Sequence, residues 1–224
     1  MRAKSLDVAG RIEAPSGHLT LSAPGTDAGD GVILRDGARL LADGVTVAFA
    51  DTKAYGPGGD VALKSAHGNV DVQSGAIVSV SGGEGGDAGQ LALMAQEGAV
   101  HAAANTLRGD ASAAKPDLRQ GELVVDAKTV AVDELADAVA ETTAGGTRKT
   151  HFIGQWDVRQ RSGDLDLTKT VKASQVTFAA DNGGITVAAT GKIDASGARG
   201  GEISLYSRNG DVRLSGALLA PPRH

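Results

Sequence analysis

The chain has 224 residues, a net charge of −5, no cysteine and 32 glycines, and only 3% of its residues are aromatic. The absence of cysteine excludes a disulfide scaffold and a cysteine-ligated metal site. The negative charge, without any basic run, argues against a surface that binds nucleic acid. No apolar run approaches the length of a membrane span. With so few aromatic side chains, we expect a core of Ala, Val, Leu and Ile packed in thin, regular layers.

The first stretch, residues 6–50, contains short runs in which apolar residues alternate with polar ones. Turn residues such as Gly, Pro, Asp and Ser separate the apolar pairs Leu6/Val8, Leu19/Leu21 and Val45/Val47. Alternation over short runs bounded by turn residues predicts β-strands joined by tight corners. The spacing here is irregular, so it predicts strands without fixing their register.

From Gly58 the apolar pairs recur at fixed intervals. The interval from a first to a second strand is 9 residues in four places: 61 to 70, 91 to 100, 176 to 185 and 203 to 212. The interval from a second to a third strand is 8 residues in two places, 70 to 78 and 185 to 193. The full repeat is 27 residues from 176 to 203 but 30 from 61 to 91, and the loop 82–89 is longer than the loop 197–201 by that difference of three. Repetition at this length predicts a solenoid.

We therefore predict an all-β fold, a right-handed parallel β-helix with three short strands per coil of about 27–30 residues. Each strand is expected to pair with its equivalent one coil further on, about 4.8 Å away. The handedness follows the rule for crossovers between parallel strands. One coil cannot bury its apolar face alone, so its neighbours must supply stability. The whole chain, residues 1–224, is expected to form a single β-helix segment.

The repeat is interrupted over residues 105–162, which we expect to form an irregular insert. Residues 121–127 resume a strand, and the next apolar residues are spaced as on one face of a helix: Val132, Leu135, Ala136, Val139 and Ala140. This predicts a short amphipathic helix near residues 133–143, capped by Asp133 and ended by Gly145–Gly146. Residues 150–158, which hold the only Trp, Trp156, are expected to form an outer strand or loop over that helix.

The repeated pattern Gly-x-(Val/Ile/Leu)-x-(Val/Leu)-x-(Ala/Ser) resembles the filamentous haemagglutinin family of surface exoproteins from Gram-negative bacteria. The best matches are residues 75–83 and 191–197, and residues 179–187 and 121–143 are similar too. The resemblance is best over residues 58–104 and from 121 onward. The chain departs from the family in having no amino-terminal secretion domain with Asn-Pro motifs.

The resemblance implies an internal shaft segment of a secreted adhesin at the bacterial cell surface, exported by two-partner secretion through an outer-membrane transporter. It implies no cofactor, and as partners it implies neighbouring coils of a longer parent chain and a host-surface receptor, an extracellular-matrix receptor or a glycan. Met1–Ser5 lacks the apolar core of a signal peptide. An exported protein with this sequence is therefore expected to be part of something longer.

The candidate binding site is Arg108–Gly109–Asp110, the tripeptide that integrins recognise, in an expected loop. Residues 82–87 match the first half of a calcium-binding nonapeptide, but the apolar residue that should follow is absent and the motif occurs once, which favours a spacer loop.

Asp164 and Asp166 alternate with leucines, so both carboxylates are expected to face outward on one strand. Such a pair suits acid–base or nucleophilic cleavage of a polysaccharide, although outward polar pairs occur on any solvated strand. The five histidines (His18, His67, His101, His151 and His224) show neither helical pairing nor a close carboxylate cluster, so no metal site and no catalytic triad is expected.

The leading expectation is a non-enzymatic shaft segment that displays loops for attachment. The alternatives are a polysaccharide lyase or hydrolase built on a β-helix, and a module that binds haem or a metal carrier.

Overall fold

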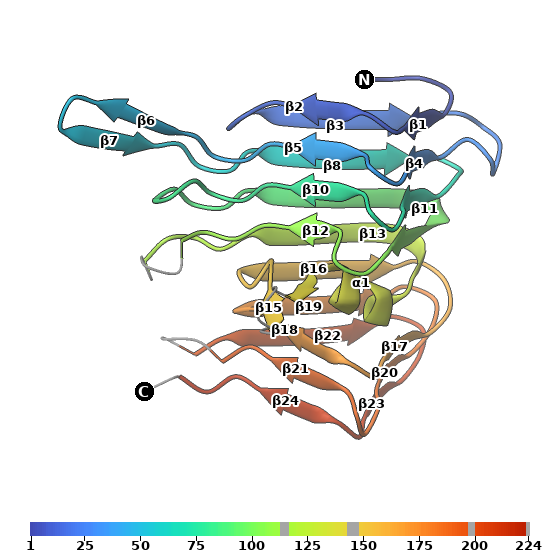
Figure 1. The fold of residues 1–224 in the computed structure, drawn as a ribbon. Coiled ribbons are helices and arrows are strands. Elements are labelled where there is room, and N and C mark those ends of the chain that lie inside the picture. Colours follow the sequence, from blue (N-terminus) through green and yellow to red (C-terminus); the bar gives the residue numbers. More distant parts are fainter. Residues whose placement is uncertain (113–116, 143–147, 197–199, 223–224) are drawn as a thin grey trace.

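The computed structural model describes residues 1–112, 117–142, 148–196 and 200–222, and these form an almost entirely β structure with parallel sheets (Figure 1). The strands fall into three series that stack along one axis, with the N-terminus and the C-terminus at opposite ends of the stack. We call one strand from each series, taken in chain order, a unit. Antiparallel hairpins and the short helix α1 (Val132–Ala138) are inserted between strands of this stack.

The first series forms the continuous long sheet, in which each strand pairs in parallel with the next. Its strands are β3 (His18–Ala23), β8 (Asp60–Ser65), β11 (Gln90–Ala102), β13 (Glu122–Val130), β16 (Gln155–Gln160), β19 (Gln175–Ala180) and β22 (Glu202–Ser207). Alternate side chains point inward, as the period of two predicts.

The second and third series are each divided by the level at which α1 lies. The second series consists of β1 (Leu6–Val8), β4 (Val32–Leu34), β9 (Val70–Val72) and the far end of β11 on one side, and β17 (Leu165–Leu167), β20 (Ile185–Val187) and β23 (Val212–Leu214) on the other. The third series consists of β2 (Arg11–Glu13), β5 (Arg39–Leu41), β10 (Ile77–Ser79) and β12 (Leu107–Arg108), and then β18 (Thr170–Lys172), β21 (Lys192–Asp194) and β24 (Ala217–Leu219).

The register predicted from the 9-residue interval is confirmed in both halves of the chain. Val61 lies opposite Leu91 and Val70 opposite Val100. In the C-terminal half, 176 lies opposite 203, and 185 opposite 212. The core is the interior of this stack, and it consists of small and medium apolar side chains from all three series. Close approach of backbones at the corners explains part of the glycine content: a Cβ on Gly89 would lie 1.8 Å from the carbonyl oxygen of Gly59 in the unit before it.

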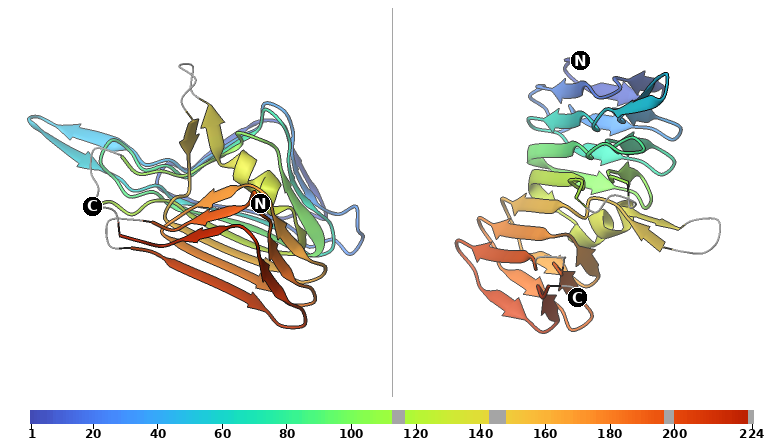
Figure 2. Two further views of the ribbon diagram at one scale, coloured as in Figure 1. Left: turned by 90° about the horizontal axis from the view of Figure 1, so that it is seen from below. Right: turned by 90° about the vertical axis from the view of Figure 1, so that its left-hand side faces the viewer.

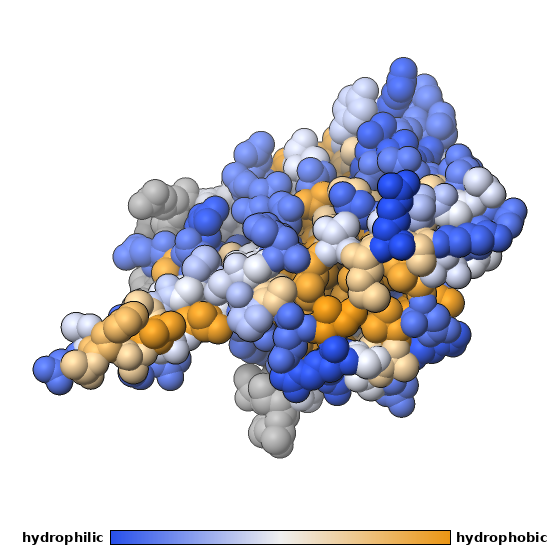
Figure 3. All heavy atoms as spheres, turned by 90° about the horizontal axis from the view of Figure 1, so that it is seen from above, coloured by the Kyte–Doolittle hydropathy of each residue, from blue (hydrophilic) through white to orange (hydrophobic). Residues whose placement is uncertain are grey.

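The hairpin of β6 (Thr46–Phe49) and β7 (Thr52–Tyr55) projects from the side of the stack (Figures 1 and 2). It carries Val45, Val47 and Phe49, which are 41%, 44% and 60% exposed and give the projecting arm its apolar surface (Figure 3). The strand predicted from the alternation around Val45 and Val47 is confirmed as β6, but these side chains lie on the surface. Their segment pairs locally with β7 instead of with a neighbouring unit, and so the alternation there does not face the core.

The interval 105–162 is more regular than its sequence predicts. β13 and β16 both lie inside the long sheet, and Leu123 stands opposite Leu91 on one side and Trp156 on the other. In the unit that begins with β13, the end of β13 still continues the second series, with Thr129 opposite Ala99 and Val130 opposite Val100. The rest of the second strand and the third strand of that unit are replaced by α1 and by the hairpin of β14 (Ala140–Thr142) and β15 (Arg148–Thr150).

The predicted amphipathic helix exists but is shorter than the expected span of residues 133–143. It ends at Ala138 because the chain turns at Val139 into β14, and the apolar spacing of Val139 and Ala140 continues past the helix end. The expected cap is also wrong: Ala131 is the N-cap and makes no side-chain hydrogen bond. The predicted stop at residues 145–146 lies outside the described residues.

Asp133 instead joins the helix to the next unit. Its carboxylate accepts hydrogen bonds from the backbone N–H groups of Thr168 and Lys169, at 2.9 and 3.1 Å, and from the hydroxyl of Thr168. On its other side, α1 accepts backbone N–H groups from Asn105 and Thr106 on the carbonyls of residues 137 and 138, both at 3.0 Å. The helix therefore bridges the two parts of the stack.

The expectation that residues 150–158 form an outer strand or loop is wrong as well. Trp156 lies in β16, in the middle of the long sheet, and is 1% exposed. It is a core residue, and so it offers no surface on which a sugar ring could stack.

Candidate functional site

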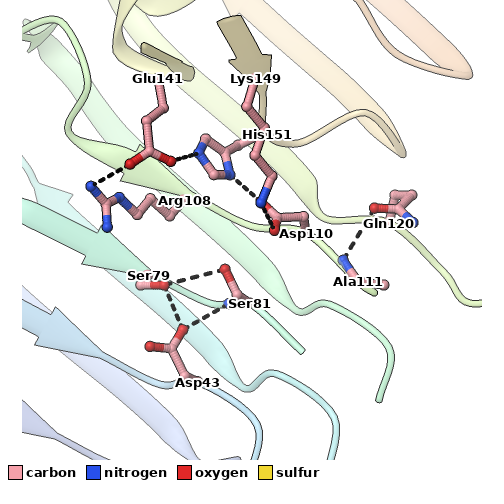
Figure 4. A network of polar contacts seen from close by, with 10 residues as sticks. All are labelled: Asp43, Ser79, Ser81, Arg108, Asp110, Ala111, Gln120, Glu141, Lys149 and His151. Carbon is pink, nitrogen blue, oxygen red and sulfur yellow. Dashed lines mark hydrogen bonds and ion pairs between the residues drawn. The ribbon is translucent and has the colours of Figure 1, made fainter. Parts of the chain in front are cut away.

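The tripeptide Arg108–Gly109–Asp110 lies at the edge of the stack, directly beneath the β14–β15 hairpin (Figure 4). Arg108 ends β12, and the chain continues beside the preceding unit: the N–H groups of Val80 and Gly82 donate to the carbonyls of Arg108 and Asp110, both at 2.9 Å. The tripeptide therefore extends the third series and is not a free loop.

Five ionisable side chains, from the tripeptide, the hairpin and the residue that follows the hairpin, form one cluster. The Arg108 guanidinium lies 3.1 Å from Glu141, and Lys149 Nζ lies 2.6 Å from Asp110. Between the two carboxylates stands His151, with Nδ1 on Asp110 and Nε2 3.2 Å from Glu141 (Figure 4). We call these five residues the clamp cluster.

The surroundings of His151 determine what its imidazole can do. Both ring nitrogens face carboxylate oxygens, which accept hydrogen bonds and cannot donate them, so both contacts are hydrogen bonds only when the ring carries both protons. A ring in that state has no free lone pair to act as a general base. The residue is also only 3% exposed. The arrangement suits a buried link between the hairpin and the stack.

The Asp110 carboxyl is kept ionised by its partners. Burial on its own would raise the pKa of Asp110, but the hydrogen bonds from His151 and Lys149, together with their positive charges, outweigh it and hold that pKa below its ordinary value. Since the folded-state pKa is lowered, the clamp cluster stabilises the fold at neutral pH and loses this contribution as the pH falls through the acidic range.

Gly109 is required by the packing of the ring next to it. A Cβ on Gly109 would lie 2.5 Å from Cε1 and 2.7 Å from Cζ of Phe152, whose side chain is fully buried. Phe152 has a positive φ of 53° and donates its N–H to the carbonyl of Gly109 at 2.9 Å. Its own carbonyl accepts the indole N–H of Trp156 at 3.0 Å. The packing of Phe152 therefore explains why residue 109 is a glycine.

Each residue of the candidate binding tripeptide therefore has an intramolecular partner. Arg108 binds Glu141, Gly109 packs on Phe152, and Asp110 contacts both Lys149 and His151. A receptor that used the tripeptide would first have to displace the β14–β15 hairpin.

A second polar contact fixes the neighbouring corner drawn in Figure 4. The Asp43 carboxylate accepts the hydroxyl of Ser79 at 2.5 Å and the backbone N–H of Ser81 at 2.9 Å. On the other side of the tripeptide, the Gln120 side chain accepts the N–H of Ala111 at 3.1 Å. These contacts satisfy backbone groups where the chain leaves the third series.

The other acidic candidates also have structural partners. Asp87, in the suspected calcium loop, accepts hydrogen bonds from the backbone N–H and Nε of Arg119, at 3.0 and 3.2 Å. Asp164 accepts the N–H of Gly184 at 2.7 Å, whereas Asp166 is exposed on β17 opposite Thr186. The two carboxylates do face solvent, as predicted.

The histidines have carboxylate neighbours that the sequence did not indicate. Within the described ranges each histidine lies within ion-pair distance of one: the pairs are His18–Asp60 at 2.9 Å, His67–Glu97 at 3.5 Å and His101–Glu134 at 3.2 Å, besides the two contacts of His151. These carboxylates are mostly 30 to 42 residues away along the chain, and so sequence spacing does not reveal them. His224 lies outside the described residues.

Glu141, Lys149 and His151 are the residues that the sequence did not indicate. A weak signal exists, because Lys149 and His151 alternate and so lie on one face of an extended segment. Nothing in the sequence shows that this face meets Asp110, 41 residues from His151.

In the part of the chain that the structure describes, no group of three or more His, Cys, Asp or Glu side chains is placed to hold a metal ion. Nor does that part contain a helix with the length and apolar character needed to span a membrane. No family model, no curated protein and no solved structure matches the chain.

Proposed function

We propose that the chain is a structural segment of a secreted bacterial surface protein, a right-handed parallel β-helix like the shafts of the filamentous haemagglutinin family. The observation that carries the proposal is the register, in which equivalent strands pair in parallel at fixed steps, such as 61 with 91 and 70 with 100. An arrangement of this kind grows along one axis by adding units, and so it makes a rod. The handedness follows the crossover rule.

The proposed activity is geometric and needs no catalytic group. The stacked units hold inserted segments away from their axis, and the β6–β7 hairpin with its exposed Phe49 is one such displayed element (Figure 2). The partner is a receptor of a host surface or of the extracellular matrix, or a glycan. Export across an outer membrane suits a chain without cysteine, because no disulfide can form before secretion.

Small-angle X-ray scattering and circular dichroism test the architecture. We expect an elongated particle whose spectrum is dominated by strands and which resists limited proteolysis within the stack. A compact, nearly spherical particle, or a spectrum dominated by helix, would contradict the β-helix.

Binding and turnover assays on the same protein test the function. Extracellular-matrix and glycan arrays are run alongside polysaccharide hydrolase and lyase assays, and we expect binding without turnover. The matched variants are Asp164→Ala and Asp166→Ala, which remove the outward carboxylates one at a time. Turnover of any polysaccharide that is lost in either variant would overturn the non-enzymatic proposal.

A further inference from the structure

A long hollow of about 1110 Å³ runs across the corners where the third series returns to the first. Its lining includes the first residues of four consecutive first-series strands, β13, β16, β19 and β22. It lies apart from the clamp cluster, none of whose residues lines it. We call this hollow the corner groove.

The lining of the corner groove comes from the connections that precede these four strands. Two of the connections are short: residues 173 and 174 separate β18 from β19, and residues 151–154 separate β15 from β16. They contribute Gly154 and Ser174 to the lining. On either side of them, the lining consists of residues 117–120 before β13 and residues 200 and 201 before β22.

A ladder of hydrogen-bonding side chains lies along the corner groove. Glu122 is paired in register with Gln155, Gln155 with Gln175, and Gln175 with Glu202. Their strand neighbours at 123, 156 and 176 point into the core, so these side chains point outward. Equivalent positions on paired strands are about 4.8 Å apart, and so the rungs recur at that spacing along the stack.

The two central rungs have unused hydrogen-bonding capacity. In the described part of the chain, the side-chain amides of Gln155 and Gln175 have no protein hydrogen-bond partner. Each amide offers two donors and one acceptor oxygen. The flanking carboxylates of Glu202 and of Glu122, which also accepts the side-chain amide of Gln90 at 3.2 Å, add acceptors. Such a row matches a ligand that presents donors and acceptors at short, regular intervals.

The charge and the shape of the corner groove's lining restrict which class of ligand it can bind. The lining contains the carboxylates of Asp117, Glu122 and Glu202, and its arginine, Arg119, is already bound to Asp87. Polyanions are therefore repelled. The lining has no aromatic residue, and it offers no row of apolar pockets for the alternate side chains of an extended peptide.

We propose that the corner groove binds an unbranched, neutral or amino-sugar oligosaccharide in extended form, with its axis along the stack. Successive sugar hydroxyls pair with the amides of Gln155 and Gln175 and with the carboxylates of Glu122 and Glu202. This inference rests on the proposed attachment function and deepens it by assigning the class of ligand and the residues that hold it.

The test uses the full chain on an array of neutral, amino-sugar and anionic oligosaccharides and extended peptides, followed by calorimetry with the strongest binder. The double variant Gln155→Ala/Gln175→Ala removes both free amides. Gln96→Ala, an exposed glutamine of β11 outside the groove, is the matched control. Circular dichroism and Trp156 fluorescence check that both variants are folded.

We expect neutral or amino-sugar chains to bind, with a loss of at least tenfold in affinity in the double variant and less than twofold in the control. Equal binding by the folded double variant would overturn the assignment of the site while leaving attachment to glycans intact. Exclusive binding of polyanions, exclusive binding of peptides, or no binding at all would overturn the inference. The rod itself is judged separately, by scattering.

Discussion

Replacing Gly109 by alanine tests whether this glycine is required by its packing against Phe152. The new Cβ would lie 2.5 Å from Cε1 of Phe152, nearly 1 Å inside an ordinary carbon–carbon contact, and the fully buried ring has no free space to enter. Overpacking of this kind costs about 1–3 kcal/mol. The ring is also held through its backbone, since Phe152 donates to the carbonyl of Gly109 and accepts from Trp156.

Urea unfolding followed by Trp156 fluorescence measures this cost, because Trp156 is the only tryptophan and is bonded to the affected residue. Gly10→Ala is the matched control, since a Cβ at Gly10 meets nothing within 4 Å. The double variant Gly109→Ala/Phe152→Leu makes room and is expected to recover part of the loss. If Gly109→Ala is within about 0.5 kcal/mol of the control, the packing argument is refuted.

Three further outcomes follow from exposure and charge. Leu167→Ala, at a fully buried site, is expected to cost about 2–5 kcal/mol, whereas Leu214→Ala, in the same inward column but 51% exposed, is expected to cost under about 1 kcal/mol in chemical denaturation. Asp110→Asn is expected to lower the thermal midpoint at pH 7, and its difference from wild type is expected to shrink as the pH falls below the ordinary pKa of an aspartate, about 3.9, because the folded-state pKa of Asp110 is lowered; a difference that does not shrink on acidification would contradict this. Phe49→Ser, on the projecting hairpin, is expected to change stability by less than about 0.5 kcal/mol, and a larger loss would mean that the hairpin packs on the stack.

The regular parts of the fold are predictable because apolar residues that stack in successive units recur at fixed sequence intervals. Val61, Val70 and Val78 each stack on their counterpart in the next unit, so one repeat is sufficient to predict the register of the next. The register of the segment before Gly58, which contains β4 and β5, was not predictable from the sequence interval. The projecting hairpin lengthens the interval between the paired residues Leu19 and Val61 to 42 residues.

The clamp cluster was not predictable for a different reason. It depends on the hairpin folding back over the third series, which brings His151 to Asp110 across 41 residues. No local sequence pattern specifies that the hairpin folds back in this way.

The length of the helix was overestimated because apolar spacing does not show where the backbone turns. The apolar spacing that predicted a helix near residues 133–143 is the same before and after the turn at Val139.

The level of α1 gives the molecule unequal mechanical properties on its different sides. The long sheet passes this level through an uninterrupted backbone ladder between β13 and β16. On the other two sides, side chains make the contacts across this level among the described residues: Asp133 with Thr168 and Lys169, Asp137 with Lys169, and Gln160 with the N–H of Val130. Because the backbone ladder is continuous only in the long sheet, the stack is expected to bend most readily toward or away from the long sheet. Under a lateral load, we therefore expect this level to yield first and to set the direction of bending.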